Sequence, residues 1–316
     1  MARKVSPLEA QLDRLAELRR QPSSPEGRAE LARYLGGKSN LPAAKAARIA
    51  GEWQAAELAP DLAAAFERFM LKPETTDKGC EAKIAILKTL CNMEHSAPSV
   101  FLRGLKHVQM EPSFGGPVDT AAPVRALSAM GLAQTNYPDA LEEILPLLLD
   151  RQRDARIGAV RAIAASGLAG DTLLLRLKAL SGDEPEVLGE CFAALLRAAP
   201  AKSIEFVARF LDNHGEAIAE AAALALGDSR VEGAFPVLRA AFARARSRAL
   251  GRTLLLAIAL LRREDAIDYL LDLVRNGEEL NSTDAAAALA VYEQDPNLHE
   301  RLARARAGRQ PPPFQR

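Results

Sequence analysis

The chain has 316 residues, is 48% hydrophobic but only 5% aromatic, and has a formal net charge of zero at pH 7. A core made mainly of Ala and Leu favours helices and disfavours an all-β fold. Zero net charge removes the whole-molecule attraction that favours binding to nucleic acid or an anionic membrane, so any such binding has to be local.

Membrane, secretion and disulfide signals are weak in this sequence. The longest apolar run, Leu254–Leu261, is too short to cross a bilayer, and the charged N-terminal stretch does not resemble a secretory signal. We therefore expect a cytoplasmic protein. Cysteines number three, and Cys80 and Cys91 are eleven residues apart. In one helix that spacing separates them by about 16 Å, so reduced core cysteines are expected.

The first elements expected in chain order are two amphipathic helices, Pro7–Arg20 and Pro25–Leu35. We predict that they form a helical cap over residues 1–40, because terminal repeats are commonly atypical. Helix pairs of low regularity follow. Two connecting segments, residues 71–79 and 111–123, are long and rich in Pro and Gly, so any unusual loop is expected there.

A repeated pattern begins near residue 124. The stretches VRALSAMGLA (124–133) and VRAIAASGLA (160–169) agree at seven of ten positions. Similar helices recur at intervals of 29 to 36 residues, anchored at Ala126, Ala162, Ala193, Ala222, Leu256 and Ala286. A period in the thirties indicates stacked helix pairs. The sequence therefore predicts an all-α fold, an α-α superhelix of about eight helix pairs over residues 41–307, with a disordered tail over residues 308–316.

One repeat shows the local reasons for this pattern. Asp154 is an N-cap or first-turn acid, Ile157 and Val160 lie on one apolar face, and Gly167 can adopt the left-handed conformation that ends a helix. The alanines of this repeat leave the backbone nearly bare, so neighbouring helices can approach closely.

These residues resemble the HEAT-like repeat family, including its phycobilisome-lyase-type variant. In EILPLLLDRQRDARIGAVRAIAASG (residues 143–167), Pro146 lies in the first helix, Asp150 at the turn, and Arg156 and Ala159 in the second helix, as in the family pattern. The resemblance covers about nine tenths of the chain and implies a HEAT-like solenoid. It names no activity, because such repeats serve scaffolds, transport factors and a few enzymes.

The sequence contains few residues or motifs that could support metal binding or catalysis. Deoxyhypusine hydroxylase, an enzyme with similar repeats, holds iron with several His-Glu pairs, whereas this chain has one such pair, His299 with Glu300. The four histidines fall in separate repeats, and we expect them at solvated helix ends. Sequence motifs for a catalytic nucleophile or a phosphate loop are also missing. We assign no catalytic residue, metal or cofactor, and leave a metal-dependent or lyase-like activity open.

Charge is segregated near the C-terminus. Residues 230–263 contain eight arginines and one glutamate, and residues 264–300 contain ten acids and one arginine. Such blocks can steer a partner of complementary charge, or can pair with each other between repeats. In the family, the Val-Arg helix lines the concave surface. The resemblance thus implies that one set of arginines faces a partner: Arg125, Arg156, Arg161, Arg248 and Arg252.

We therefore expect a non-enzymatic protein-interaction scaffold with a mixed-charge surface. Its expected partner is another protein, bound through an acidic segment, and no membrane is involved. The alternative is a HEAT-like protein that binds nucleic acid, with a possible role in DNA base repair, through the arginine-rich edge at residues 239–252.

Overall fold

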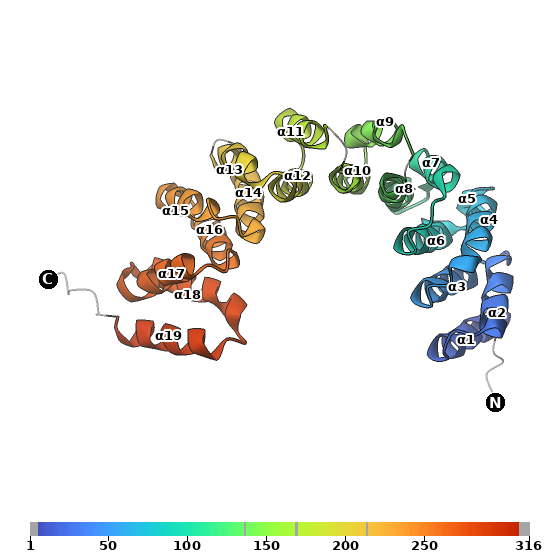
Figure 1. Ribbon diagram of the computed structural model, residues 1–316, viewed down its shortest axis with the longest axis horizontal. Coiled ribbons are helices and arrows are strands. Elements are labelled where there is room, and N and C mark those ends of the chain that lie inside the picture. Colours follow the sequence, from blue (N-terminus) through green and yellow to red (C-terminus); the bar gives the residue numbers. More distant parts are fainter. Residues whose placement is uncertain (1–5, 136, 168–169, 213, 310–316) are drawn as a thin grey trace. The chain divides into compact units, whose positions relative to one another are not determined.

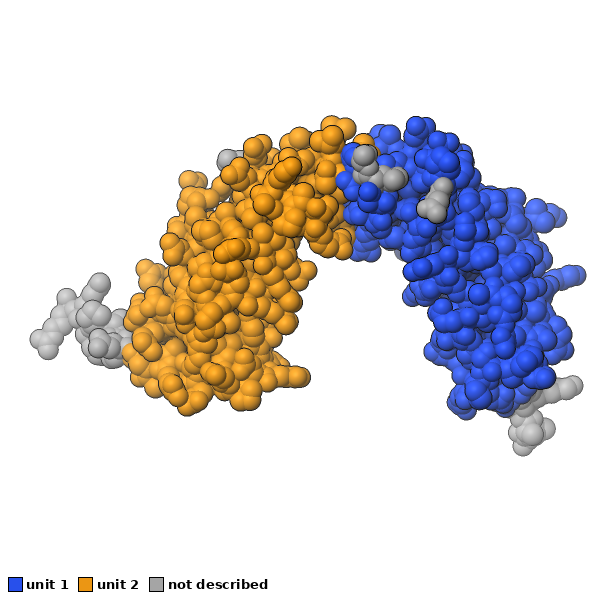
Figure 2. Space-filling model, in the orientation of Figure 1, with its two compact units in different colours: residues 1–171 blue, residues 172–316 orange. Residues whose placement is uncertain are grey.

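The computed structural model describes residues 6–135, 137–167, 170–212 and 214–309. Regular structure in these residues is helical apart from one two-stranded hairpin (Figure 1), so the predicted all-α fold class is confirmed. The chain forms two compact units, residues 1–171 and residues 172–316 (Figure 2).

Unit 1 contains ten complete α-helices and both strands among its described residues. The helices are α1 (Pro7–Arg20), α2 (Pro25–Leu35), α3 (Asn40–Glu52), α4 (Ala59–Phe69), α5 (Pro73–Thr76), α6 (Glu81–Asn92), α7 (Pro98–Leu105), α8 (Ala122–Gln134), α9 (Ala140–Ile144) and α10 (Arg153–Ser166). Strand β1 (Met110–Glu111) pairs antiparallel with β2 (Val118–Asp119). Short 3₁₀ segments are η1 (Ala56–Leu58), η2 (Lys78–Cys80) and η3 (Leu145–Leu149).

Unit 2 begins inside the first turn of α11, and its described residues form nine α-helices. They are α11 (Asp171–Ser181), α12 (Pro185–Ala198), α13 (Pro200–Ala208), α14 (Glu216–Ser229), α15 (Ala234–Arg244), α16 (Arg248–Leu260), α17 (Glu264–Asn276), α18 (Glu279–Ala288) and α19 (Pro296–Ala307). The 3₁₀ segments η4 (Arg209–Leu211) and η5 (Leu289–Tyr292) extend α13 and α18.

Each unit is a stack of helix pairs in two layers. In unit 1, α3, α6, α8 and α10 contact one another in sequence, while α2, α4, α7 and α9 pack on that row. In unit 2, α12, α14, α16 and α18 form the equivalent row, with α13, α15 and α17 on it. The buried residues along both rows are mainly Ala and Leu, as composition predicts. Each helix therefore buries its apolar face only when its mate and the next pair are present.

Local side chains and glycine fix the ends of several helices. Ser6 and Glu9 form a capping box at α1, in which the Ser6 hydroxyl accepts from the Glu9 N–H and the Glu9 carboxylate accepts from the Ser6 N–H. Asp154 lies in the first turn of α10, and Gly167 ends that helix at φ 60°. Of the two predicted positions for Asp154, the N-cap or the first turn, the first turn is the one observed.

The predicted helices Pro7–Arg20 and Pro25–Leu35 are confirmed as α1 and α2. The boundary between the units lies inside the predicted stack of residues 41–307. That residues 1–40 act as a separate cap stays a prediction. Most of the predicted tail, residues 310–316, lies outside the described residues. Among the described helices, none has the length and apolar composition needed to cross a bilayer.

Candidate functional site

Arg125, one of the predicted partner contacts, lies in the interior of unit 1, where 3% of the residue is exposed. Its Nε and Nη2 donate to the two carboxylate oxygens of Asp150 at 2.8 and 3.0 Å. Nη1 donates to the carbonyl oxygen of His107 at 2.8 Å, and Asp119 lies 2.9 Å from Nη2. The expectation for Arg125 is therefore corrected, because its donors are used inside the protein and do not reach a partner.

Arg248 and Arg252 on α16 remain exposed, but both face Asp284 on α18. Arg248 donates to the two Asp284 carboxylate oxygens at 3.0 Å each, and Arg252 Nε lies 3.7 Å from Asp284 Oδ1. The hydrogen bonds from Arg248 hold the pKa of Asp284 below its usual range. Partner binding by these arginines stays a prediction, and an acidic ligand there has to compete with Asp284.

Arg156 and Arg161 lie on α10. Arg156 is half-buried, and its Nη1 donates to the carbonyl oxygens of Asp150 and Arg151 at 2.8 and 3.2 Å. Arg161 is exposed. Both have partners within the protein, and a role for either in binding another molecule stays a prediction.

Ion pairs about one repeat apart connect neighbouring helix pairs in both units. Examples are Arg19–Glu52, Arg48–Glu81, Arg103–Glu67, Arg244–Asp212 and Arg301–Asp268. The opposite-sign blocks near the C-terminus meet in the same way, since Arg248 of the basic block binds Asp284 of the acidic block. Pairing between repeats therefore accounts for part of the charge segregation, and each exposed pair contributes little to stability.

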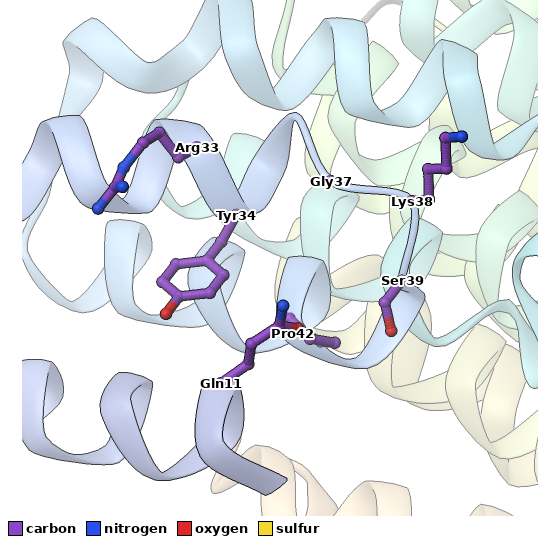
Figure 3. Close-up of a pocket in the computed structure, with 7 residues that line it drawn as sticks. All are labelled: Gln11, Arg33, Tyr34, Gly37, Lys38, Ser39 and Pro42. Carbon is purple, nitrogen blue, oxygen red and sulfur yellow. The ribbon is translucent and has the colours of Figure 1, made fainter. Parts of the chain in front are cut away.

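A pocket of about 520 Å³ opens near the N-terminus of unit 1 (Figure 3). Residues of α1, α2, α3 and the α2–α3 loop line it: Gln11, Arg33, Tyr34, Gly37, Lys38, Ser39 and Pro42. The two charged residues in this lining are both basic. Figure 3 shows them toward opposite ends of the pocket, with Tyr34 and Gln11 between them.

The positive charge of this pocket is weakly compensated. Glu30 Oε1 lies 4.0 Å from Arg33 Nη2, the limit of an ion pair. The same carboxylate accepts two hydrogen bonds of 2.9 Å from Arg14, which hold the pKa of Glu30 below its usual range. Ser39 occupies the N-cap position of α3, yet its side chain makes no capping hydrogen bond. The pocket thus offers cations and hydroxyl groups to an anionic ligand.

A second distinctive region is the connection between α7 and α8, residues 106–121, which contains the β hairpin. By comparison, residues 182–184 suffice to join α11 to α12. Gln109 at the hairpin base is fully buried, and its Nε2 donates to the Asp77 carbonyl oxygen at 2.9 Å and to Glu111 Oε1 at 2.5 Å. Glu111 also accepts from the Gly79 N–H at 2.7 Å. The hairpin is thereby fixed to the loop before α6.

A buried ion pair supports that loop. Lys83 Nζ lies 3.0 Å from Asp77 Oδ2, and both side chains are fully buried. Asp77 also accepts from the N–H groups of Ala82 and Lys83, and Lys83 Nζ donates to the Phe69 carbonyl oxygen at 3.3 Å. Removing either partner would leave a buried charge without its counter-ion, so the pair fixes the conformation of residues 77–83.

His107 corrects the expectation that the histidines lie at solvated helix ends. It is 8% exposed, and its Nε2 lies 3.1 Å from Gln109 Oε1. Because the Gln109 amide nitrogen already donates to Asp77 and Glu111, its oxygen is left to accept, and the neutral His107 tautomer with a proton on Nε2 fits. Burial lowers the pKa of His107.

The described residues contain no group of three or more His, Cys, Asp or Glu side chains able to hold a metal ion. Cys80, Cys91 and Cys191 are buried, as expected for core cysteines. Cys80 differs from expectation in one respect, because it precedes α6 with a left-handed φ of 57° and does not share a helix with Cys91.

Sequence reasoning missed the N-terminal pocket. Arg33, Tyr34 and Lys38 were taken only as part of a cap, although two cations beside a Gly-Gly turn were a usable signal. The hairpin was anticipated in outline, since residues 111–123 were expected to form an unusual loop, but its buried polar base was not.

No protein-family model and no curated protein sequence matches this chain. Among solved structures, it is similar to human deoxyhypusine hydroxylase in complex with glycerol, with 18% sequence identity, a TM-score of 0.28, and 92% of each chain covered. That protein is an enzyme, which corrects our expectation of a purely non-enzymatic scaffold, whereas the nucleic-acid-binding alternative stays a prediction. At this similarity it assigns no reaction, metal or substrate to this chain.

Proposed function

We propose that this chain binds another protein, and that an acidic segment of this partner enters the N-terminal pocket lined by Arg33, Tyr34, Lys38 and Ser39. The observation that carries the proposal is the charge of the pocket, since both charged lining residues are basic. We keep two sequence-based predictions with it: membership of the HEAT-like family and a cytoplasmic location.

The dimensions and polarity of the pocket support an extended acidic segment. A volume of about 520 Å³ accommodates several residues of a peptide. Arg33 and Lys38 lie toward its two ends (Figure 3), so two carboxylates on one segment can each meet a cation. Between them, the hydroxyl groups of Tyr34 and Ser39 can donate hydrogen bonds to carboxylate or backbone oxygens.

The pocket is better placed for this ligand than the arginines of α16. Arg248 and Arg252 already share the Asp284 carboxylate, whereas the carboxylate nearest to Arg33 is bound by Arg14. An incoming acidic segment therefore displaces no bidentate ion pair at the N-terminal pocket. Our proposal keeps the predicted acidic partner and moves its binding site from the predicted arginines, which include Arg248 and Arg252, to the α2–α3 loop.

A short fluorescent polyglutamate peptide tests the proposal, with binding to the full chain followed by fluorescence anisotropy. Reversing both pocket charges, Arg33→Glu with Lys38→Glu, should weaken binding by about tenfold or more at low salt. Added salt should weaken binding to the wild-type protein, because exposed charges are screened over about 10 Å at 0.1 M ionic strength.

The matched control is Lys88→Glu with Lys202→Glu, which changes the net charge equally at two exposed positions outside the pocket. This variant should bind the peptide almost as well as the wild-type protein. Equal loss of binding in both double variants would show that net charge, not the pocket, attracts the peptide, and would refute the proposed site.

A further inference from the structure

The Glu30 carboxylate on α2 lies within reach of two arginines, of which one lines the N-terminal pocket and the other does not. Arg14 on α1 donates to both carboxylate oxygens, with Nε–Oε1 and Nη2–Oε2 distances of 2.9 Å. Arg33 in the pocket lining is farther away, since its Nη2 lies 4.0 Å from Oε1. A bidentate pair is a strong arrangement of guanidinium and carboxylate, so Arg14 is the arginine that Glu30 binds.

Exposure shows which of the three side chains most needs a partner. The Glu30 side chain is 14% exposed, whereas those of Arg14 and Arg33 are 44% and 78% exposed. A carboxylate with so little water around it is costly to leave unpaired. An arginine in contact with solvent keeps much of its hydration and changes rotamer quickly. Glu30 therefore has to be satisfied, and it binds the guanidinium that is within reach.

The packing of α1 keeps Arg14 beside Glu30. Buried Leu15 and Leu18 hold α1 against the rest of unit 1, and Arg14 directly precedes Leu15 in the chain. Glu30 and Arg33, by contrast, are three residues apart on α2, a spacing that places two side chains on one face of a helix. Arg33 can therefore close the remaining distance when Arg14 does not hold the carboxylate.

We propose that Glu30 is an internal competitor for the acidic ligand, and that Arg14 keeps it away from Arg33. This inference rests on the proposed function of the N-terminal pocket. While Arg14 holds the Glu30 carboxylate, the Arg33 guanidinium is available to an acidic segment. Without Arg14, Glu30 binds Arg33 and occupies one of the two cations in the pocket lining. Arg14 is thus a positioning residue, which controls affinity through Glu30 from outside the lining.

Binding of the fluorescent polyglutamate peptide to variants of the full chain tests this control. Arg14→Gln should weaken binding by about threefold to fivefold, the effect of occupying one exposed cation. Adding Glu30→Gln removes the competitor and should restore the wild-type affinity. If Arg14 had only a structural role, this second change would not rescue binding, because it restores none of the contacts that Arg14 makes.

Arg14→Gln with Glu17→Gln is the matched control. Glu17 on α1 is also a partner of Arg14, at 3.4 Å, so this variant has the same net charge as the rescued one. It leaves Glu30 able to bind Arg33, and its affinity should stay as low as that of Arg14→Gln. Equal rescue by both glutamate changes would mean that net charge alone controls the pocket, and the inference would then be wrong.

A second measurement needs no ligand and separates this inference from the proposed function. Phenylglyoxal modifies accessible guanidinium groups, and peptide mass spectrometry follows its rate of reaction at Arg33. This rate should fall severalfold in Arg14→Gln and return to the wild-type value when Glu30→Gln is added.

The two measurements can fail independently. If polyglutamate does not bind the wild-type protein, the proposed function is refuted, while the Arg33 rates still decide whether Arg14 keeps Glu30 away from Arg33. If the peptide binds but the Arg33 rate is the same in all three proteins, the pocket stands and its control by Arg14 is refuted.

Discussion

Arg125 on α8 and Asp150, in the loop before α10, form a bidentate ion pair inside unit 1, with Nε–Oδ2 and Nη2–Oδ1 distances of 2.8 and 3.0 Å. Arg125 also meets Asp119 at the end of the hairpin. One guanidinium therefore joins two successive helix pairs and the hairpin. Desolvation of Arg125 opposes its charged form, but the hydrogen bonds that it donates to the Asp150 and Asp119 carboxylates, together with their negative charges, outweigh this and raise its pKa.

Replacing Arg125 should strongly destabilise unit 1. In Arg125→Ala, the carboxylates of Asp119 and Asp150 remain in the interior without their cation, at a cost of about 3–5 kcal/mol. Arg103→Ala on α7 is the control, because it removes an exposed ion pair with Glu67 that contributes about 0–1 kcal/mol. Urea unfolding followed by circular dichroism measures both. Similar unfolding midpoints for the two variants would show that the buried ion pair does not hold these elements together.

Stability should fall in mild acid because of His107. Burial is the largest influence on its pKa and lowers it, although the hydrogen bond with Gln109 and the charge of Asp119 oppose that shift. The unfolded chain then takes up a proton near the ordinary pKa of about 6.5, whereas the folded chain does so only at lower pH. This contribution to stability is complete above that pKa and is lost as the pH falls toward the folded value.

Urea midpoints measured between about pH 7 and pH 5 test this prediction. Other groups titrate in the same interval, so the comparison is with His107→Gln, which keeps a side-chain N–H to donate to Gln109 but does not titrate. The wild-type midpoint should decrease more steeply than that of the variant. Parallel curves would show that His107 does not cause the loss.

The sequence predicted the helices well and the arginines poorly, for different physical reasons. Helix ends depend on local residues, so Pro7, Gly167 and the spacing of alanines placed them correctly. Whether an arginine faces solvent depends on which acid the next repeat supplies. Both Arg125 and Arg248 were expected to face a partner, yet Arg125 is enclosed by Asp119 and Asp150, while Arg248 meets Asp284 at the surface.

The candidate sites could not be predicted from the sequence either, because they too depend on contacts between residues that are distant along the chain. The Pro- and Gly-rich composition of residues 111–123 indicated a loop, but not that Gln109 would anchor it through backbone atoms far away in sequence. Likewise, the N-terminal pocket combines Gln11 of α1 with Lys38 of the α2–α3 loop. Periodicity reveals which face of a helix is apolar, but not which polar groups from different helices converge.

The cysteine thiols should resist modification in the folded protein. Burial raises the pKa of Cys80 to about 11 and those of Cys91 and Cys191 to about 12. The reactive thiolate is therefore scarce near pH 8, and reagents also lack access. Ellman's reagent should modify all three quickly in guanidinium chloride and none quickly without it. Fast native modification of Cys91, which is 8% exposed, would contradict this prediction.

The close approach of α8 and α10 depends on Gly158. A Cβ atom at this position would lie 2.3 Å from the Ala126 Cβ and 2.5 Å from the Ala126 Cα. Because the Ala126 backbone cannot rotate away, Gly158→Ala must separate the helices. We expect a loss of about 1–3 kcal/mol, despite the better helix propensity of alanine.

Gly189 on α12 provides the matched control. A Cβ atom there would lie 3.6 Å from the Ala221 Cβ, an ordinary van der Waals distance. Gly189→Ala should therefore stabilise the protein by up to about 1 kcal/mol, because alanine restricts the unfolded chain and favours the helix. Urea midpoints should shift in opposite directions for the two variants. A shift in the same direction would mean that close helix contact does not determine where glycine is required in the repeats.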